Sequence, residues 1–98
     1  MAKPHFMEAL EKGDPQLFAQ VNSLREFVGA EGALSAKVKT LMSLFGDAIL
    51  NHPDGVRALA EAARARGATE QEIAETVRMA LLFGGLPALV TATRAFRE

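Results

Sequence analysis

The sequence contains no cysteine among its 98 residues. Without a thiol, the chain can form no disulfide, bind no metal through thiolate ligands and perform no reaction that needs a cysteine nucleophile. An excess of basic charge is also missing, because 11 lysines and arginines face 12 aspartates and glutamates, for a net charge of −1. Proteins that bind nucleic acid normally present a basic surface, so this balance argues against nucleic acid as a partner.

Long apolar runs are missing as well. The longest one, MALLFGGLPALV, is interrupted by two glycines and a proline and is shorter than the roughly 20 residues that cross a bilayer. The first residues, MAKPHFMEAL, lack the apolar centre and the small-residue cleavage site of a signal peptide. We therefore expect a protein with no membrane partner, and the cytoplasm as its default location.

Apolar residues are abundant, at 49% of the sequence. A chain of this length is expected to form a single domain, residues 1–98, and to bury only a modest part of its surface when it folds alone. Apolar content beyond what one small interior can hold is accommodated when subunits bury it between them. We therefore expect a homo-oligomer, built on a dimer.

Helical spacing dominates the pattern, and strand-like alternation never extends beyond a few residues. Asp14 followed by Pro15, then Ser35, and the capping box Thr69-Glu70-Gln71-Glu72 are strong helix starts. The start of one further helix stays open between Asn51 and Asp54. Together these signals predict an all-α bundle of five or six helices: a short one before residue 14, and others that begin near residues 14, 35, 51–54, 69 and 86.

Two of these helices have faces that can be assigned from spacing. On the helix that begins at Ser35, the polar residues Thr40, Ser43 and Asp47 share one face, which is expected to meet solvent. The residues expected to face inward are Val38, Leu41, Met42, Phe45, Ala48 and Ile49 on this helix, and Val77, Ala80, Leu81 and Phe83 on the helix that begins near residue 69.

Three segments resemble the carboxymuconolactone decarboxylase and alkyl hydroperoxidase D-like superfamily. They are GALSAKVKTLMSL (32–44), RGATEQEIAETVRMALLFGGLPALV (66–90) and TRAF (93–96). Their order and spacing carry the resemblance more than any one segment does. The resemblance implies an all-helical domain that assembles as a dimer, a trimer or a hexamer.

Redox members of this superfamily carry Cys-x-x-Cys-x-x-x-His at the start of the helix that corresponds to the one near residues 51–54 here. They also carry a glutamate on the helix before it. There a thiolate attacks, a second sulfur resolves the intermediate, and Glu and His move protons. In this chain the two cysteine positions hold His52 and Gly55, the histidine position holds Leu59, and the glutamate position holds Thr40. Only an insertion of about one and a half helical turns would place His52 on the family histidine. The resemblance therefore predicts the scaffold without thiol peroxidase activity.

His52 and Asp47 are the remaining candidates for catalysis. If they meet in a cleft, an Asp–His pair can act as a general base or orient a substrate. Both can equally face solvent, with His52 bonded to backbone at a helix start. The sequence thus leaves two hypotheses open: a small-molecule-binding or assembly protein without the family reaction, or a cofactor-free decarboxylase or isomerase acting on a small organic acid or lactone.

Few features of the sequence suggest a ligand. Lys37 and Lys39 can simply be solvated. Alternatively, they and the N–H groups at the start of the helix near residues 51–54 could attract a small anionic organic molecule. His5 and His52 have no recognised metal-binding spacing, and no glycine loop for phosphate is present. We therefore expect neither a metal nor a cofactor.

The charged residues on the helix that begins near residues 51–54 are expected to form a solvated face. Arg57, Arg64 and Arg66 lie there with Glu61. The i,i+4 spacing predicts an ion pair between Arg57 and Glu61.

Overall fold

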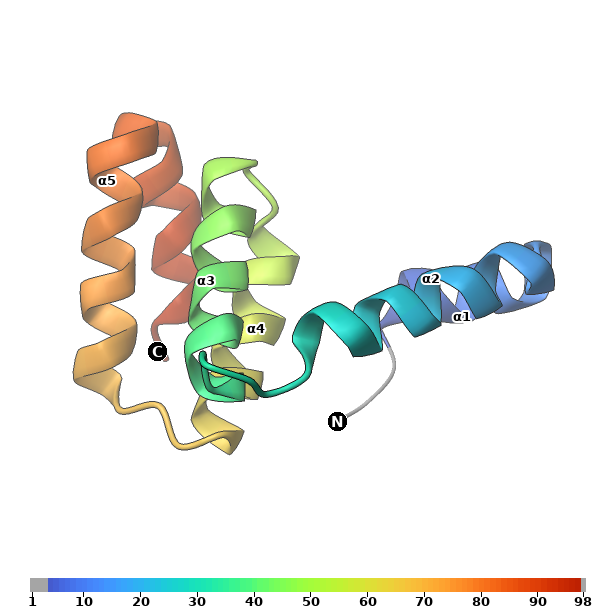
Figure 1. Ribbon diagram of the computed structural model, residues 1–98. Coiled ribbons are helices and arrows are strands. Elements are labelled where there is room, and N and C mark those ends of the chain that lie inside the picture. The colour runs from blue at the N-terminus through green and yellow to red at the C-terminus, as the bar shows by residue number, and fades with distance from the viewer. Residues whose placement is uncertain (1–3, 98) are drawn as a thin grey trace. The chain divides into compact units, whose positions relative to one another are not determined.

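The computed structural model describes residues 4–97, which form helices and no strand (Figure 1). This confirms the predicted all-α class, and five α-helices lie within the predicted range. They are α1 (His5–Gly13), α2 (Pro15–Gly29), α3 (Ala36–Ile49), α4 (Pro53–Ala65) and α5 (Glu70–Ala92), followed by the 3₁₀ helix η1 (Thr93–Ala95).

The chain divides into two compact units, Met1–Gly32 and Ala33–Glu98. In the first unit α1 packs against α2. The carboxylate of Asp14 accepts a hydrogen bond of 3.0 Å from the N–H of Leu17, which is the predicted cap of α2. The guanidinium of Arg25 lies 5.4 Å from the ring centre of Phe6, so the two helices are also linked by a cation–π contact.

In the second unit, α3 packs against both α4 and α5, and η1 closes against α4 and α5. The predicted caps form here too. Ser35 accepts a hydrogen bond of 3.1 Å from the N–H of Val38, and Thr69 and Glu72 form a reciprocal capping box with bonds of 2.8 and 3.0 Å. The start of α4, which the sequence left open between Asn51 and Asp54, has His52 at the N-cap position, and no side chain caps it. Asn51, just before it, has a φ of 60°.

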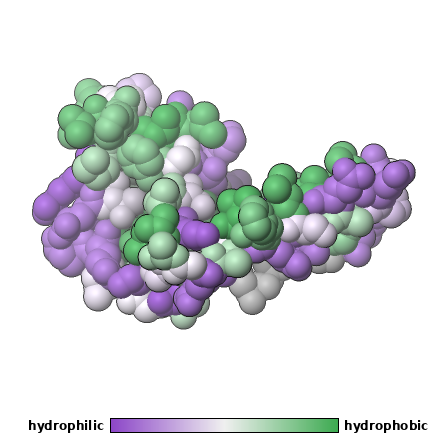
Figure 2. Space-filling model, viewed as in Figure 1, coloured by the Kyte–Doolittle hydropathy of each residue, from purple (hydrophilic) through white to green (hydrophobic). Residues whose placement is uncertain are grey.

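The core of the second unit consists mainly of small residues. Nine of its thirteen buried apolar residues are alanines, and Leu44, Val56, Ile73 and Val77 are the others. Alanines let helix axes approach closely, but they leave little interior volume for large side chains. Large apolar side chains therefore gather on the outside, over the end of the unit where α5 bends (Figure 2).

The inward face of α3 differs from the expectation. Thr40, Leu44 and Ala48 are its buried residues, whereas Val38 and Met42 are 37% and 56% exposed. The reason is that α3 packs against both α4 and α5. Its buried residues face the space between these two helices, and Val38 and Met42 lie at the edge of that contact. Thr40 can be buried because its hydroxyl donates a hydrogen bond of 2.7 Å to the carbonyl of Ala36.

The predicted break at Gly84-Gly85 divides α5. Gly85 has φ 70° and ψ −164°, a conformation open essentially to glycine alone, and the chain turns back on itself there (Figure 1). A Cβ at Gly84 would lie 2.4 Å from that of Ala88 and 2.9 Å from Ile49 Cδ1. Leu81 and Phe83, expected to face inward, are instead exposed, because Val77 and Ala80 occupy the buried face of this part of α5.

By length and composition, the segment Glu70–Ala95 is apolar enough to cross a membrane, with a mean hydropathy of 1.5. The bend at Gly85 separates it into two helical pieces. Each piece is shorter than the roughly 20 residues that a spanning helix needs.

Candidate functional site

His52 and Asp47 meet at the junction of α3 and α4. His52 Nδ1 lies 3.6 Å from Asp47 Oδ1, and the backbone N–H of His52 donates a hydrogen bond of 2.8 Å to the carbonyl of Asp47. The side chains are 61% and 30% exposed, respectively. The pair is thus formed at the surface, and neither residue lines the two hollows described below.

Gly55 determines where the carboxylate of Asp47 lies. A Cβ on Gly55 would stand 2.0 Å from Asp47 Oδ2, so a larger residue there would force the carboxylate to move. Asp47 therefore places its negative charge against the first turn of α4, where the helix dipole favours it. Any other anion at this helix start would be repelled by Asp47, which argues against the anion site expected there.

The positions that correspond to the superfamily redox motif carry little chemistry. Thr40 is buried and Leu59 packs against the core. The hydroxyl of Thr40 also accepts a hydrogen bond from Arg66 Nη1. Of these positions only that of His52 bears an acid–base group. Within residues 4–97, no three His, Asp or Glu side chains are grouped to hold a metal ion.

Lys37, proposed from sequence to attract an anion, is already paired. Its Nζ lies 2.9 Å from Glu72 Oε2 and links the start of α3 to the start of α5. This hydrogen bond, with that from the Thr69 backbone, lowers the pKa of Glu72. The lysine charge is thereby offset within the protein.

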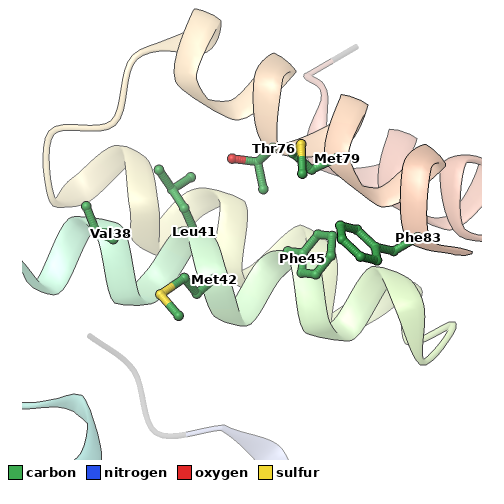
Figure 3. Close-up of a pocket in the computed structure, with 7 residues that line it drawn as sticks. All are labelled: Val38, Leu41, Met42, Phe45, Thr76, Met79 and Phe83. Atoms are coloured by element: carbon green, nitrogen blue, oxygen red, sulfur yellow. The ribbon is translucent and has the colours of Figure 1, made fainter. Parts of the chain in front are cut away.

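An apolar groove of about 300 Å³ runs between α3 and α5 (Figure 3). Phe45 and Phe83 meet at one end, edge to face, with ring centres 5.8 Å apart. Thr76 supplies the one hydroxyl among the lining side chains, and it donates to the carbonyl of Glu72 at 2.9 Å. The groove therefore offers apolar surface with little to orient a polar ligand. Its lining residues are Val38, Leu41, Met42, Phe45, Thr76, Met79 and Phe83.

A second hollow, of about 660 Å³, lies between α4, η1 and the residues after η1. We call it the arginine hollow, because four arginines and one glutamate contribute to its lining. These residues are Arg57, Glu61, Arg64, Thr93, Arg94, Ala95, Phe96 and Arg97.

Arg64 is the centre of the arginine hollow, and its side chain is only 8% exposed. Its Nε and Nη2 donate to the two carboxylate oxygens of Glu70 at 2.7 and 2.8 Å. Its Nη1 donates to Glu61 at 2.8 Å, and its Nη2 also donates to the carbonyl of Ala95 at 2.8 Å. Arg64 thereby links α4, the start of α5 and η1, and its hydrogen bonds lower the pKa of Glu70.

The ion pair predicted between Arg57 and Glu61 is not found among the described residues. Glu61 pairs instead with Arg64 and with Arg97, whose Nη2 lies 2.9 Å from Glu61 Oε2. The hydrogen bond from Arg97 is the largest cause that lowers the pKa of Glu61. Sequence spacing missed this network because its partners are distant along the chain.

Comparisons with known proteins agree with this architecture. The model of the carboxymuconolactone decarboxylase family matches residues 15–98. A crystal structure of a carboxymuconolactone decarboxylase family protein from Legionella pneumophila is similar, with a TM-score of 0.84, 28% sequence identity, and coverage of 91% of this chain and 80% of that one. The curated proteins contain no significant match. The chain therefore belongs to the carboxymuconolactone decarboxylase family, as a member without cysteine.

Proposed function

We propose that this chain is a homo-oligomeric assembly protein of its family that works without thiol chemistry. The observation that supports this is that, in the second unit, most buried apolar residues are alanines, whereas many large apolar side chains are exposed. Seven of these large side chains are each between 45% and 71% exposed: Met42, Leu50, Met79, Leu82, Phe83, Leu86 and Val90.

The exposed area is of the size that an interface needs. If a large apolar side chain offers on the order of 150–200 Å² when fully exposed, the seven together expose roughly 800 Å². Each partner in a stable protein–protein interface contributes about 800 Å². A second copy of the chain, related by a two-fold axis, can cover this surface with the same surface of its own, which makes a dimer the basic assembly and leaves a trimer or a hexamer as larger forms.

A second copy suits the apolar groove better than a small molecule does. Small-molecule sites bury about 70–90% of their ligand and use a few polar groups to orient it. Here Met42 and Phe83 are more than half exposed, and the hydroxyl of Thr76 is already bonded to backbone. An open apolar groove of this kind fits a helix face.

The assembly is tested by measuring mass in solution. We expect the wild-type protein to sediment as a multiple of its 10.5 kDa chain at micromolar concentration. The double variant Phe83→Glu with Leu86→Glu should sediment as a monomer with unchanged helical circular dichroism, because charge would be buried at the interface. The double variant Gln71→Glu with Arg78→Glu, which adds acidic charge elsewhere on α5, is the control. A wild-type protein that stays monomeric throughout would refute the assembly.

The lack of thiol chemistry is tested by hydroperoxide turnover with a dithiol reductant. No rate above background is expected, because the chain has no cysteine thiol to be oxidised by the peroxide and reduced again by the dithiol. Turnover by the purified protein would contradict the proposal. A cytoplasmic location completes it and can be checked by cell fractionation.

A second candidate function is a cofactor-free decarboxylase or isomerase for a small organic acid or lactone. The specific observation in its favour is the 3.6 Å approach of His52 to Asp47. If it is correct, wild-type protein should turn over an aromatic acid or lactone, and His52→Ala should abolish the rate while its mass in solution stays the same. Unchanged turnover in His52→Ala would exclude this site.

A further inference from the structure

We infer that the arginine hollow is a binding site for a small oxyanion, meaning a carboxylate or phosphate group held between Arg57 and Arg94. This inference is independent of the assembly proposed above, since its residues lie outside the apolar groove. The first argument for an anion is the net positive charge of the side chains that line the hollow. Counted over residues 4–97 alone, four arginines and Glu61 line it, which gives +3, and Glu70 on Arg64 reduces this to +2.

The excess charge can be assigned to particular side chains. Arg64 is bonded to Glu70 and Glu61, and Arg97 is bonded to Glu61. These four groups offset one another. Within residues 4–97 no carboxylate forms an ion pair with Arg57 or with Arg94, and both are exposed. The two arginines therefore account for the unbalanced charge in the hollow.

There is a structural reason why no carboxylate of the described part of the chain pairs with Arg57. Its helical neighbour Glu61 would be the usual partner at i,i+4. Both oxygens of Glu61 are instead used, Oε1 by Arg64 and Oε2 by Arg97. The network thus places a guanidinium in the hollow and removes the carboxylate that would have neutralised it.

The backbone beside Arg94 is held in place before any ligand arrives. Arg64 donates to the carbonyl of Ala95, the residue next to Arg94, and so ties η1 to α4. Because Arg64 is almost fully buried, this tie is shielded from water. Preorganised groups lose less entropy on binding than mobile ones.

The chemistry of two guanidinium groups selects the ligand class. Each guanidinium presents a planar fork of N–H donors that matches the geometry of carboxylate or phosphate oxygens. Phe96 lines the same hollow, so the organic part of a ligand would have an apolar wall to lie against. The start of α4, in contrast, already holds the carboxylate of Asp47. A small anion is therefore expected at the arginine hollow and not at that helix start.

The inference is tested by NMR titration of the full ¹⁵N-labelled chain at low ionic strength. Inorganic phosphate and benzoate are titrated separately, to distinguish a phosphate from an organic carboxylate. At least one should give saturable shifts at the backbone and Nε–H signals of Arg57, Arg94 and their neighbours. In the double variant Arg57→Gln with Arg94→Gln, affinity for that anion should fall at least tenfold.

Two controls make the result specific. Arg78→Gln removes an exposed arginine of α5 that lines neither hollow, and it should leave the affinity within twofold of wild type. The double variant should retain the helical circular dichroism and the mass of the wild type. The inference is overturned if neither anion shifts the hollow, if the double variant binds as well as wild type, or if the shifts centre on the start of α4.

Discussion

The two hollows of the second unit lie between different elements and are lined by opposite kinds of side chain. The apolar groove between α3 and α5 is lined by side chains that bond to almost nothing, and it is left open. The arginine hollow between α4 and η1 is lined by side chains that bond mainly within the protein, through six hydrogen bonds around Arg64 and Glu61. The first surface needs a partner to remove it from water, whereas the second is stable in water by itself.

The difference follows from how the interior is filled. Alanines such as Ala48, Ala60 and Ala88 bring the helices close, so large apolar side chains find no room inside. They accumulate where α5 bends. On the other side of the unit, the carboxylates and guanidiniums of α4 and α5 satisfy one another at distances below 3 Å. The second unit thus has one surface that is apolar and suited to association, and another that carries paired charges.

The largest expected effect comes from Gly85, whose bend creates the apolar end of the unit. Gly85→Ala should lower the free energy of unfolding by about 2–3 kcal/mol, because φ 70° with ψ −164° strains any residue with a Cβ. Chemical denaturation monitored by circular dichroism measures this. Gly46→Ala is the matched control, since a Cβ there meets nothing within 4 Å, and alanine in a helix should stabilise by roughly 1 kcal/mol. Equal effects at the two glycines would show that the bend is not strained.

The bend at Gly85 also shows what the sequence could reveal. Local signals were sufficient for the caps at Asp14, Ser35 and Thr69 and for this break, because each depends on neighbouring residues. The buried face of α3 was assigned wrongly at Thr40, because burial there depends on two packed neighbours that spacing does not reveal.

In the candidate sites, too, contacts between residues close in sequence were easier to anticipate than contacts between distant ones. The approach of His52 to Asp47 was left open by the sequence, which offered a meeting in a cleft and exposure to solvent as alternatives; the structure brings the two side chains to 3.6 Å at the surface. The partners of Arg64 were not foreseen, since Glu70 and Ala95 reach it from other elements. The alternation of arginine and glutamate on α4 indicated a charged face, but only the tertiary structure identifies the arginines left unbalanced.

The next largest effect concerns the charged surface. Arg64→Met should lower the free energy of unfolding by about 1–2 kcal/mol, because the buried carbonyl of Ala95 loses its hydrogen-bond donor. Arg64→Lys should recover only part of this, since an ammonium cannot bond Glu70 bidentately and reach Ala95 as well. Denaturation with urea measures both variants, and Arg78→Met, expected within 0.5 kcal/mol of wild type, is the control. If Arg64→Lys were as stable as wild type, the fork geometry would not matter.

The variant Arg64→Met also allows a prediction of how stability depends on pH. The pKa values of Glu61 and Glu70 are lowered in the folded state, mainly by hydrogen bonds from Arg97 and Arg64, respectively. Depressed carboxyl pKa values contribute stability that is present above the unfolded value, near 4.5, and is lost as the pH falls through the folded values. The Tm of the wild type should therefore fall between about pH 5 and about pH 3 more steeply than that of Arg64→Met. Parallel curves for the two proteins would contradict this.

The smallest expected effect is that of salt, which should change anion binding and self-association in different ways. Raising NaCl from about 50 mM to about 500 mM shortens the screening length from more than 10 Å to less than 8 Å. The affinity of the arginine hollow for phosphate should fall several-fold, because it rests on exposed charges. Self-association through the apolar surface should stay the same or strengthen, because burial of apolar area is not screened. Sedimentation and the NMR titration, repeated at both salt concentrations, measure the two responses on one protein. If self-association weakened with salt as steeply as phosphate binding, charge would hold the subunits together, and the contrast between the two surfaces would fail.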